Sequence, residues 1–168
     1  MKGFFYRNWE EPTYLGPVVL IRVFCGYYFL STGIFKYLAP AYQLPGYSKM
    51  IQDATALNPS PGYKAFLTNW VIPNIEFFRF LNVFGEMAMG LALVLGLFTR
   101  LAALVGIFAL YNYWSTLGVM GATPVAPGTP QITKLFMFGL AVVFLTSAGR
   151  SFGVDRTLHQ KFPRNPLF

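Results

Sequence analysis

Four long apolar runs constrain the fold of this chain more than any other feature. They cover residues 14–38, 75–98, 101–120 and 132–147, each close to the roughly 20 residues that an α-helix needs to cross a bilayer. Only 11% of the residues are charged and 55% are hydrophobic, whereas soluble domains carry about a quarter charged residues. The sequence therefore predicts an all-α, integral membrane four-helix bundle that forms a single domain over residues 1–168.

The connection between the first two runs, residues 39–74, is too polar and too rich in proline to span a membrane. Ser60 and Pro61 have the order of an N-cap and a first helical residue, which predicts a short helix over 61–70. A second short helix is expected near 48–57. Aromatic, weakly charged helices of this kind suit the membrane interface, and an ordinary polar loop is the alternative.

The placement of Lys and Arg predicts the orientation. Four spans put both termini on the same side as the turn at Thr99 and Arg100, and this side holds more Lys and Arg than the side of residues 39–74. Cytoplasmic segments carry such an excess. We therefore expect cytoplasmic termini, a cytoplasmic tail over 148–168 and an extracytoplasmic 39–74 loop. The N-terminal residues lack the pattern of a cleaved signal, so the first run is expected to be retained.

Charge and composition also restrict the chemistry. The net charge is +7, but no cluster of Lys and Arg is present, so the expected partners are membrane lipid headgroups rather than nucleic acid. Cys25 is the single cysteine and His159 the single histidine, and His159 lies in the polar tail. A disulfide within the chain is therefore impossible, and a metal or His-ligated haem site inside the membrane would need ligands from a partner. The sequence contains no catalytic motif, and we predict no catalytic residue.

Two opposite charges lie at comparable depth inside the predicted spans, Arg22 in the first and Glu86 in the second. At 1.5 Å per residue they lie roughly 12 Å and 20 Å from the same side of the bundle. Because an unpaired charge in the bilayer costs at least a few kcal/mol, we expect the two to pair. Asn112 lies on a polar face of the third run, beside Tyr111, and can extend this network.

The role of this polar group has two interpretations. The Arg22–Glu86 pair is either a structural salt bridge that fixes helix register, or a proton relay or the polar end of a quinone pocket. Asn112 and its neighbours either extend that site, or hold helices together, or lie near the outer interface.

Small residues predict where helices approach closely. One set lies on the Arg22 stripe of the first run and the other on a face of the second run that does not include Glu86. The two sets are Gly26 and Gly33, and Gly85, Ala88, Ala92 and Gly96.

Several stretches resemble the DoxX/DoxD family of small bacterial and archaeal membrane proteins. An early arginine is followed by "FLSTGIFKYL", then "GEMAMGLALVLGLFTRLAAL", then "SAGRSFGVD" after the last run. The matching positions are Arg22, Gly33, Lys36, Glu86, Gly90, Gly96, Thr99, Arg100, Gly149, Arg150 and Asp155. The loop over 39–74 is longer than the family leads one to expect.

The resemblance implies a bundle of four transmembrane helices in the bacterial inner membrane. It also implies a subunit of a larger complex, such as a thiosulfate:quinone oxidoreductase, a terminal quinol oxidase or an oxidative-stress complex. We therefore expect a non-catalytic accessory subunit of an energy-transducing or redox membrane complex, with other membrane subunits and lipids as partners. The alternative is a quinone-binding subunit of the thiosulfate:quinone type, in electron transport. The chain is expected to hold no cofactor of its own, with quinone or a bound lipid as candidate ligands. A transporter is a third and weaker hypothesis, because broken spans and paired repeats are not evident.

Overall fold

The computed structural model describes residues 16–118, 129–150 and 152–162, and over these ranges the chain is helical with no strand. This confirms the prediction of an all-α chain. The helices are α2 (Gly16–Leu38), α3 (Leu44–Leu57), α4 (Pro61–Phe66), α5 (Ile75–Leu95), α6 (Thr99–Tyr113), α7 (Thr129–Thr146) and α8 (Val154–Lys161).

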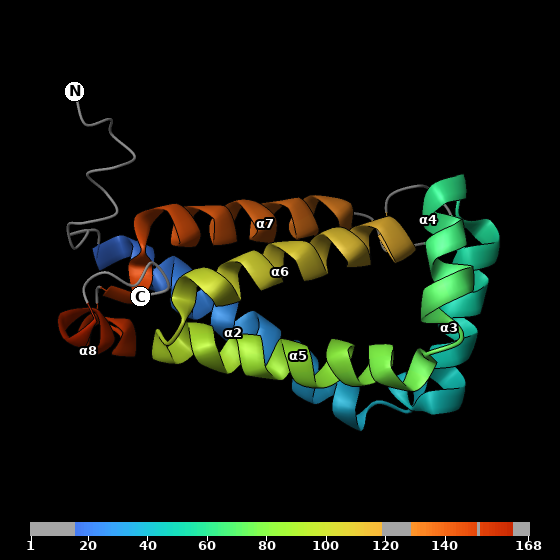
Figure 1. Cartoon of the computed structure of the whole chain (residues 1–168), viewed down its shortest axis with the longest axis horizontal. Coiled ribbons are helices and arrows are strands. Elements are labelled where there is room, and N and C mark those ends of the chain that lie inside the picture. Colours follow the sequence, from blue (N-terminus) through green and yellow to red (C-terminus); the bar gives the residue numbers. More distant parts are fainter. Residues whose placement is uncertain (1–15, 119–128, 151, 163–168) are drawn as a thin grey trace.

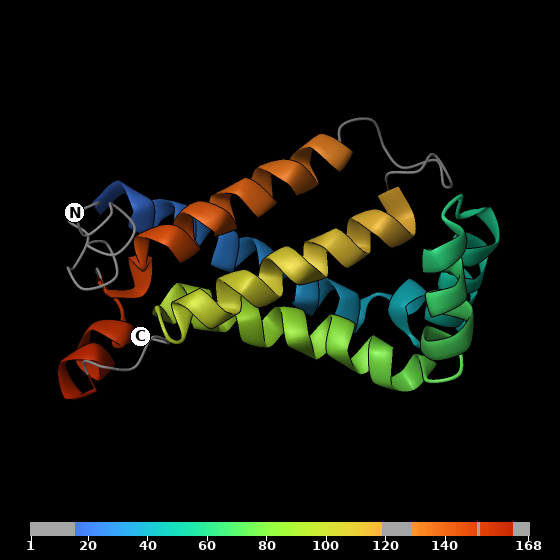
Figure 2. The ribbon, with the colours of Figure 1, turned by 45° about the horizontal axis from the view of Figure 1, so that its top comes forward.

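The four longest helices, α2, α5, α6 and α7, lie along the long axis of the molecule (Figures 1 and 2). They correspond to the four apolar runs, with ends that differ from the predicted ones by a few residues. The exception is the third run, in which α6 continues as a π-helical turn, η3 (Trp114–Gly118). The most extensive packing joins α2 to α5, and the bundle core includes Phe29, Leu93 and Leu140.

Two helices, α2 and α5, are long and apolar enough to cross a membrane by themselves. The apolar part of α7, Gln131–Thr146, is shorter. The lengths and compositions thus agree with two of the four predicted spans, and a membrane bundle of four spans stays a prediction.

Two glycines allow the backbones of α2 and α5 to touch. A Cβ atom on Gly26 would lie 2.8 Å from the Val94 backbone nitrogen and 2.9 Å from the Gly90 carbonyl oxygen. A Cβ atom on Gly90 would overlap the backbone of Leu30. Gly33 also lies against α5, where a Cβ would meet the Met87 side chain, so Gly26 and Gly33 both lie at the contact between α2 and α5.

The predicted packing face of the second run is only partly correct. Gly85 has no atom within 4 Å of the position of a Cβ, and Ala88 is exposed, so neither packs inside the chain. Ala92 packs against the bundle core. Gly96 ends α5 with a φ of +67°, a conformation that favours glycine, and lies against Arg22. The close contact comes instead from Gly90, on the Glu86 side of the helix.

Residues 39–74 form a compact unit, which we call the cap, that stands across one end of the long helices (Figure 1). It contains a 3-10 turn, η1 (Pro40–Tyr42), then α3, α4 and a π-helical turn, η2 (Leu67–Val71). Its own small core consists of Tyr47, Ile51, Leu67 and Val71. The two short helices expected in this connection are therefore present, and their location at a membrane interface stays a prediction.

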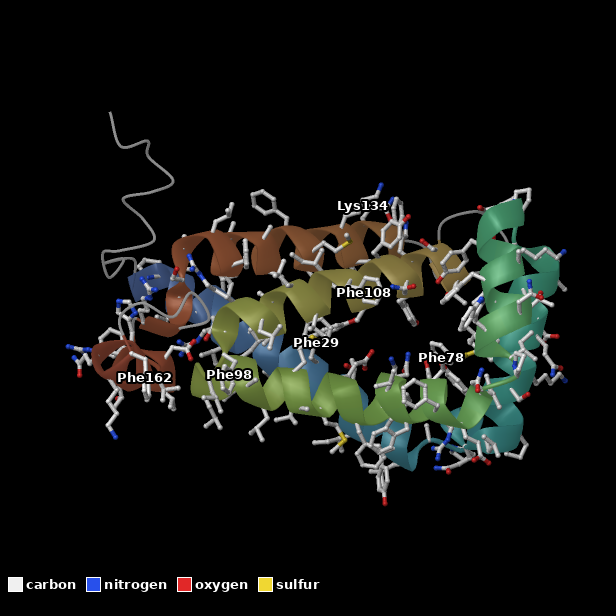
Figure 3. The ribbon with its side chains drawn as sticks, in the orientation of Figure 1. Phe29, Phe78, Phe98, Phe108, Lys134 and Phe162 are labelled. Atoms are coloured by element: carbon white, nitrogen blue, oxygen red, sulfur yellow. The ribbon has the colours of Figure 1, made fainter. Side chains whose placement is uncertain are left out.

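The opposite end of the molecule carries α8. Figure 3 shows Phe98 and Phe162 at this end, far from Phe78, which lies beside the cap. A 3-10 turn, η4 (Ala148–Arg150), connects α7 towards α8. The predicted tail, 148–168, therefore contains a helix, α8, that packs on the bundle.

Candidate functional site

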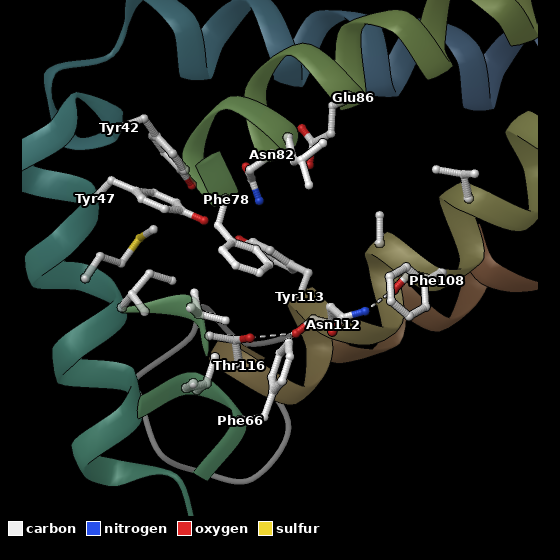
Figure 4. A pocket seen from close by; sticks show the side chains of 18 of the residues that line it. Tyr42, Tyr47, Phe66, Phe78, Asn82, Glu86, Phe108, Asn112, Tyr113 and Thr116 are labelled. Carbon is white, nitrogen blue, oxygen red and sulfur yellow. Dashed lines mark hydrogen bonds between the residues drawn. The ribbon is translucent and has the colours of Figure 1, made fainter. Parts of the chain in front are cut away.

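A cavity of about 310 Å³ lies between α5 and α6 and is closed at one end by the cap (Figure 4). Its walls are mostly aromatic and aliphatic, with a few polar side chains. The polar lining residues are Tyr42, Tyr47, Tyr63, Asn82, Glu86, Asn112, Tyr113 and Thr116. This combination of apolar walls and few polar groups is typical of a small-molecule site. The volumes of such sites start at about 300 Å³.

The acid at the cavity wall, Glu86, forms an ion pair with Lys36 of α2. The two side chains are 13% and 8% exposed. Lys36 Nζ also donates to Asn82 Oδ1 at 3.0 Å, and the Thr32 hydroxyl donates to the second carboxylate oxygen of Glu86 at 3.3 Å. The carboxylate is therefore held by a charge and a hydroxyl from the facing helix, which offsets the cost of its burial.

Two tyrosine rings enclose the lysine. Lys36 Nζ lies 5.4 Å from the ring centre of Tyr42 in the cap and 5.3 Å from that of Tyr113 in α6. Ring faces stabilise a cation at these distances. The ion pair thus joins α2, α5, α6 and the cap at one point.

The tyrosines of the cap are kept neutral by their surroundings. Burial, and then the charge of Glu86, raises the pKa of Tyr47 to about 12. Burial also raises the pKa of Tyr42 and of Tyr63 above the ordinary value of a phenol. These hydroxyls therefore face the cavity as hydrogen-bonding groups without charge.

A set of hydrogen bonds connects the cap to the end of α6. The Tyr63 hydroxyl lies 3.1 Å from Asn112 Oδ1 and 3.0 Å from the Thr116 hydroxyl. Nearby, Asn58 Nδ2 donates to the Ser115 carbonyl oxygen at 2.9 Å. These bonds hold the cap over the cavity.

Part of the cavity rim lies on the outside of the molecule. Leu81, Val105 and Phe108 line the cavity and are also 46%, 46% and 69% exposed. They belong to α5 and α6, so the cavity opens between these two helices through an apolar rim. A bilayer around the bundle would face this opening.

The structure brings together some of the predicted site residues and separates others. Glu86 and Asn112 line the same cavity, as the hypothesis of an extended polar network requires. Tyr111 is exposed on α6 and is not among the described residues that line the cavity.

The predicted pairing of Arg22 with Glu86 is wrong. Arg22 is buried at the far end of α2, where its guanidinium donates to the Ala148 and Phe152 carbonyl oxygens at 2.8 Å and 2.9 Å. The same guanidinium lies against Gly96, ten residues along α5 from Glu86. The partner of Glu86 is Lys36 because the two helices meet in a register that differs from the predicted one.

Arg22 belongs to a second buried polar cluster, in which Arg22, Arg100 and Arg150 all lie within electrostatic reach of Asp155. Asp155 is 2% exposed, and its carboxylate accepts from the backbone N–H groups of Phe98 and Thr99 at 2.7 Å and 2.8 Å. It thereby caps the N-terminus of α6, where a negative charge is favourable. This cluster fastens α8 and the end of α7 to the α5–α6 turn.

Sequence reasoning did not name Asn82 or the cap tyrosines as site residues, and it placed Lys36 only among the positions that match the family. Lys36 had a second signal, because it lies on the same helical stripe as Arg22. The cap tyrosines had none, because only the folding of residues 39–74 over the bundle brings them to the cavity.

Comparison with known families gives one match. The family described as "TQO small subunit DoxD" matches residues 18–166, which is most of the chain. The match covers α2 to α8, and therefore both the cavity and the arginine cluster. No solved structure matches the chain.

Proposed function

Because this chain belongs to the DoxD family, we propose that it is a membrane subunit of a thiosulfate:quinone-type oxidoreductase and that its cavity binds the quinone headgroup. Membership of the family and the two bilayer-length helices support a membrane location. On the orientation expected from Lys and Arg, the termini face the cytoplasm of a bacterial inner membrane. The cap and the cavity then lie in the extracytoplasmic half of the protein.

The single observation that carries the proposal is an apolar cavity with amide and carboxylate groups on its wall. A quinone ring is flat and apolar and has carbonyl oxygens that accept hydrogen bonds. Asn82 Oδ1 accepts from Lys36, so its amide NH₂ is left to donate, and its nitrogen points into the cavity (Figure 4). The rings of Phe78 and Tyr113 also line this space.

The opening of the cavity suits a ligand that arrives through the bilayer. Its rim consists of exposed apolar side chains of α5 and α6, among them Leu81 and Phe108. A quinone whose isoprenoid tail stays in lipid can bring its headgroup through such a rim without exposing it to water.

The overall reaction is the reduction of the quinone by two electrons and two protons to the quinol. Two thiosulfate ions supply the two electrons when they join as tetrathionate. We place thiosulfate oxidation on a partner subunit, and quinone binding and proton supply on this chain.

A purely structural role is the second candidate. The outer faces of α2 and α5 are strongly apolar, with Leu20 at 72%, Phe24 at 62% and Ala88 also exposed. These faces favour packing against lipids or other membrane subunits, as expected for an accessory subunit. In that case an acyl chain of a lipid would occupy the cavity.

The test uses the intact complex and a photoreactive decyl-substituted benzoquinone. We expect crosslinks to peptides of α5 and α6 that disappear with excess decyl-benzoquinone. Asn82→Leu should weaken this labelling at least tenfold, whereas Asn69→Leu, at an exposed position in η2, should not change it. Labelling that is absent, or that excess decyl-benzoquinone does not displace, would refute quinone binding and leave the structural role.

A further inference from the structure

The Lys36–Glu86 pair borders the cavity, and Glu86 is on its wall. We infer that Lys36 is the proton donor for quinone reduction and that Glu86 relays the proton from Lys36 to the quinone oxygen. This inference rests on the proposed quinone site, and it assigns the step that the site must perform beyond binding.

Lys36, Glu86 and the cavity follow one another in this order. Glu86 and Asn82 line the cavity, and Lys36 Nζ donates to a side-chain oxygen of each. Lys36 is not among the described residues that line the cavity. A proton that leaves Nζ along its hydrogen bond therefore reaches Glu86 first, and the carboxyl group is the one that a ligand in the cavity can touch.

Lysine and arginine differ as proton donors. An ammonium group can pass a proton to a hydrogen-bonded acceptor, whereas a guanidinium stays charged throughout the physiological range. The carboxylate of Glu86 accepts the proton and can pass it on, because carboxyl groups serve as both acid and base. A structural bridge alone would work equally well with arginine.

Among the described residues, the titratable side chains recorded in contact with the pair or within electrostatic reach of it are phenols, and Arg79 of α5 lies in turn within reach of Tyr47. Tyr42 of the cap and Tyr113 of α6 place their rings beside Lys36, and Tyr28 of α2 and Tyr47 of the cap lie within electrostatic reach of Glu86. Phenols carry no charge near neutral pH. Within this set the transferable charge therefore belongs to the pair itself.

Reduction of the quinone to the quinol takes up two electrons and two protons. Thiosulfate oxidation on the partner subunit delivers two electrons to the bound quinone. A proton moves from Lys36 Nζ to Glu86, and from Glu86 to a quinone oxygen, so that an N–H bond breaks and an O–H bond forms. Lys36 is then a neutral amine and regains a proton from water, and a second transfer completes the quinol.

The experiment compares substitutions that keep the charge with one that removes the relay. Variants Lys36→Arg and Glu86→Gln are assembled in the complex, with Lys49→Arg, at an exposed position, as the control. Binding of decyl-benzoquinone is measured by crosslinking, and its thiosulfate-dependent reduction is followed over pH 5.5 to 9 in H₂O and D₂O.

We expect Lys36→Arg to bind decyl-benzoquinone within about twofold of the wild type but to reduce it about 100-fold more slowly, the size of a general-acid contribution. Its rate should show a solvent isotope effect at least as large as that of the wild type, because proton transfer then limits the rate, and the control should match the wild type. Glu86→Gln, a nearly isosteric change, should give the same loss if the arginine variant does not assemble.

Two results would overturn the inference. One is reduction at the wild-type rate in Lys36→Arg, and the other is full activity in Glu86→Gln, with binding intact in both. Failure of the proposed function looks different, because then the wild-type complex itself would not bind decyl-benzoquinone.

Discussion

Filling the cavity from Gly85 is the sharpest test of a ligand site in this protein. Gly85 lies on α5, lines the cavity, and has no atom within 4 Å of the position of a Cβ. Gly62 of α4 has equally open surroundings but is not among the described lining residues. Gly85→Leu and Gly62→Leu are therefore a matched pair that differ in their relation to the cavity.

The size of the effect follows from the volumes. If each of the four added carbons takes a water-sized volume of about 30 Å³, leucine at position 85 removes about 120 Å³. This is more than a third of the 310 Å³ cavity. Overfilling a packed site costs about 1–3 kcal/mol, which corresponds to roughly a 5- to 150-fold rise in Kd. Both variants replace a helical glycine, and each should gain up to about 1 kcal/mol of helix propensity.

The assay measures the Kd of decyl-benzoquinone together with the thermal unfolding of each variant. We expect Gly85→Leu to bind at least fivefold more weakly while it unfolds no earlier than Gly62→Leu. An unchanged Kd in a variant that unfolds normally would show that the cavity does not hold the headgroup. An equal loss of binding in Gly62→Leu would point to an effect of the cap rather than of the cavity.

Three further predictions concern stability. Asp155→Ala removes a buried carboxylate that caps α6 among three arginines, which should cost about 3–5 kcal/mol and lower the unfolding temperature, whereas the exposed Arg156→Ala should not. Gly90→Ala places a methyl group against the backbone of Leu30 and should cost about 1–3 kcal/mol, read from the same unfolding curves. Tyr47 has its pKa raised to about 12, so the unfolded chain loses this proton first, and stability should fall as pH rises from about 10 towards 12. Tyr47→Phe should reduce that alkaline loss in unfolding temperatures measured between pH 9 and 11.

The long helices could be predicted from the sequence because a helix that needs about 20 apolar residues leaves a continuous signal. The start of α4 was also readable, since Ser60 and Pro61 have a local preference that tertiary contacts do not override. The cavity could not be predicted in this way. Its walls come from α3, α4, α5 and α6 and from the turns η1, η2 and η3, so it exists only once the cap has folded over the bundle.

The wrong partner predicted for Glu86 shows that the register between two packed helices cannot be read from the sequence. A helical wheel places Arg22 and Lys36 on one stripe of α2, so either could face an acid on the neighbouring helix. The choice depends on register, and the structure fixes it through Gly26 and Gly90, whose backbones touch.

Gly26 contacts both Gly90 and Val94, so it is centred opposite position 92 of α5. From there, an antiparallel pair advances one residue on α2 for each residue back on α5. Thr32 then lies opposite Glu86 and Lys36 opposite Asn82, and both of these contacts are present as hydrogen bonds. Arg22 falls opposite Gly96 at the other end of the helix, as observed. The glycine contact therefore decides which cation neutralises the acid. A lysine takes that place, and unlike arginine it can release a proton.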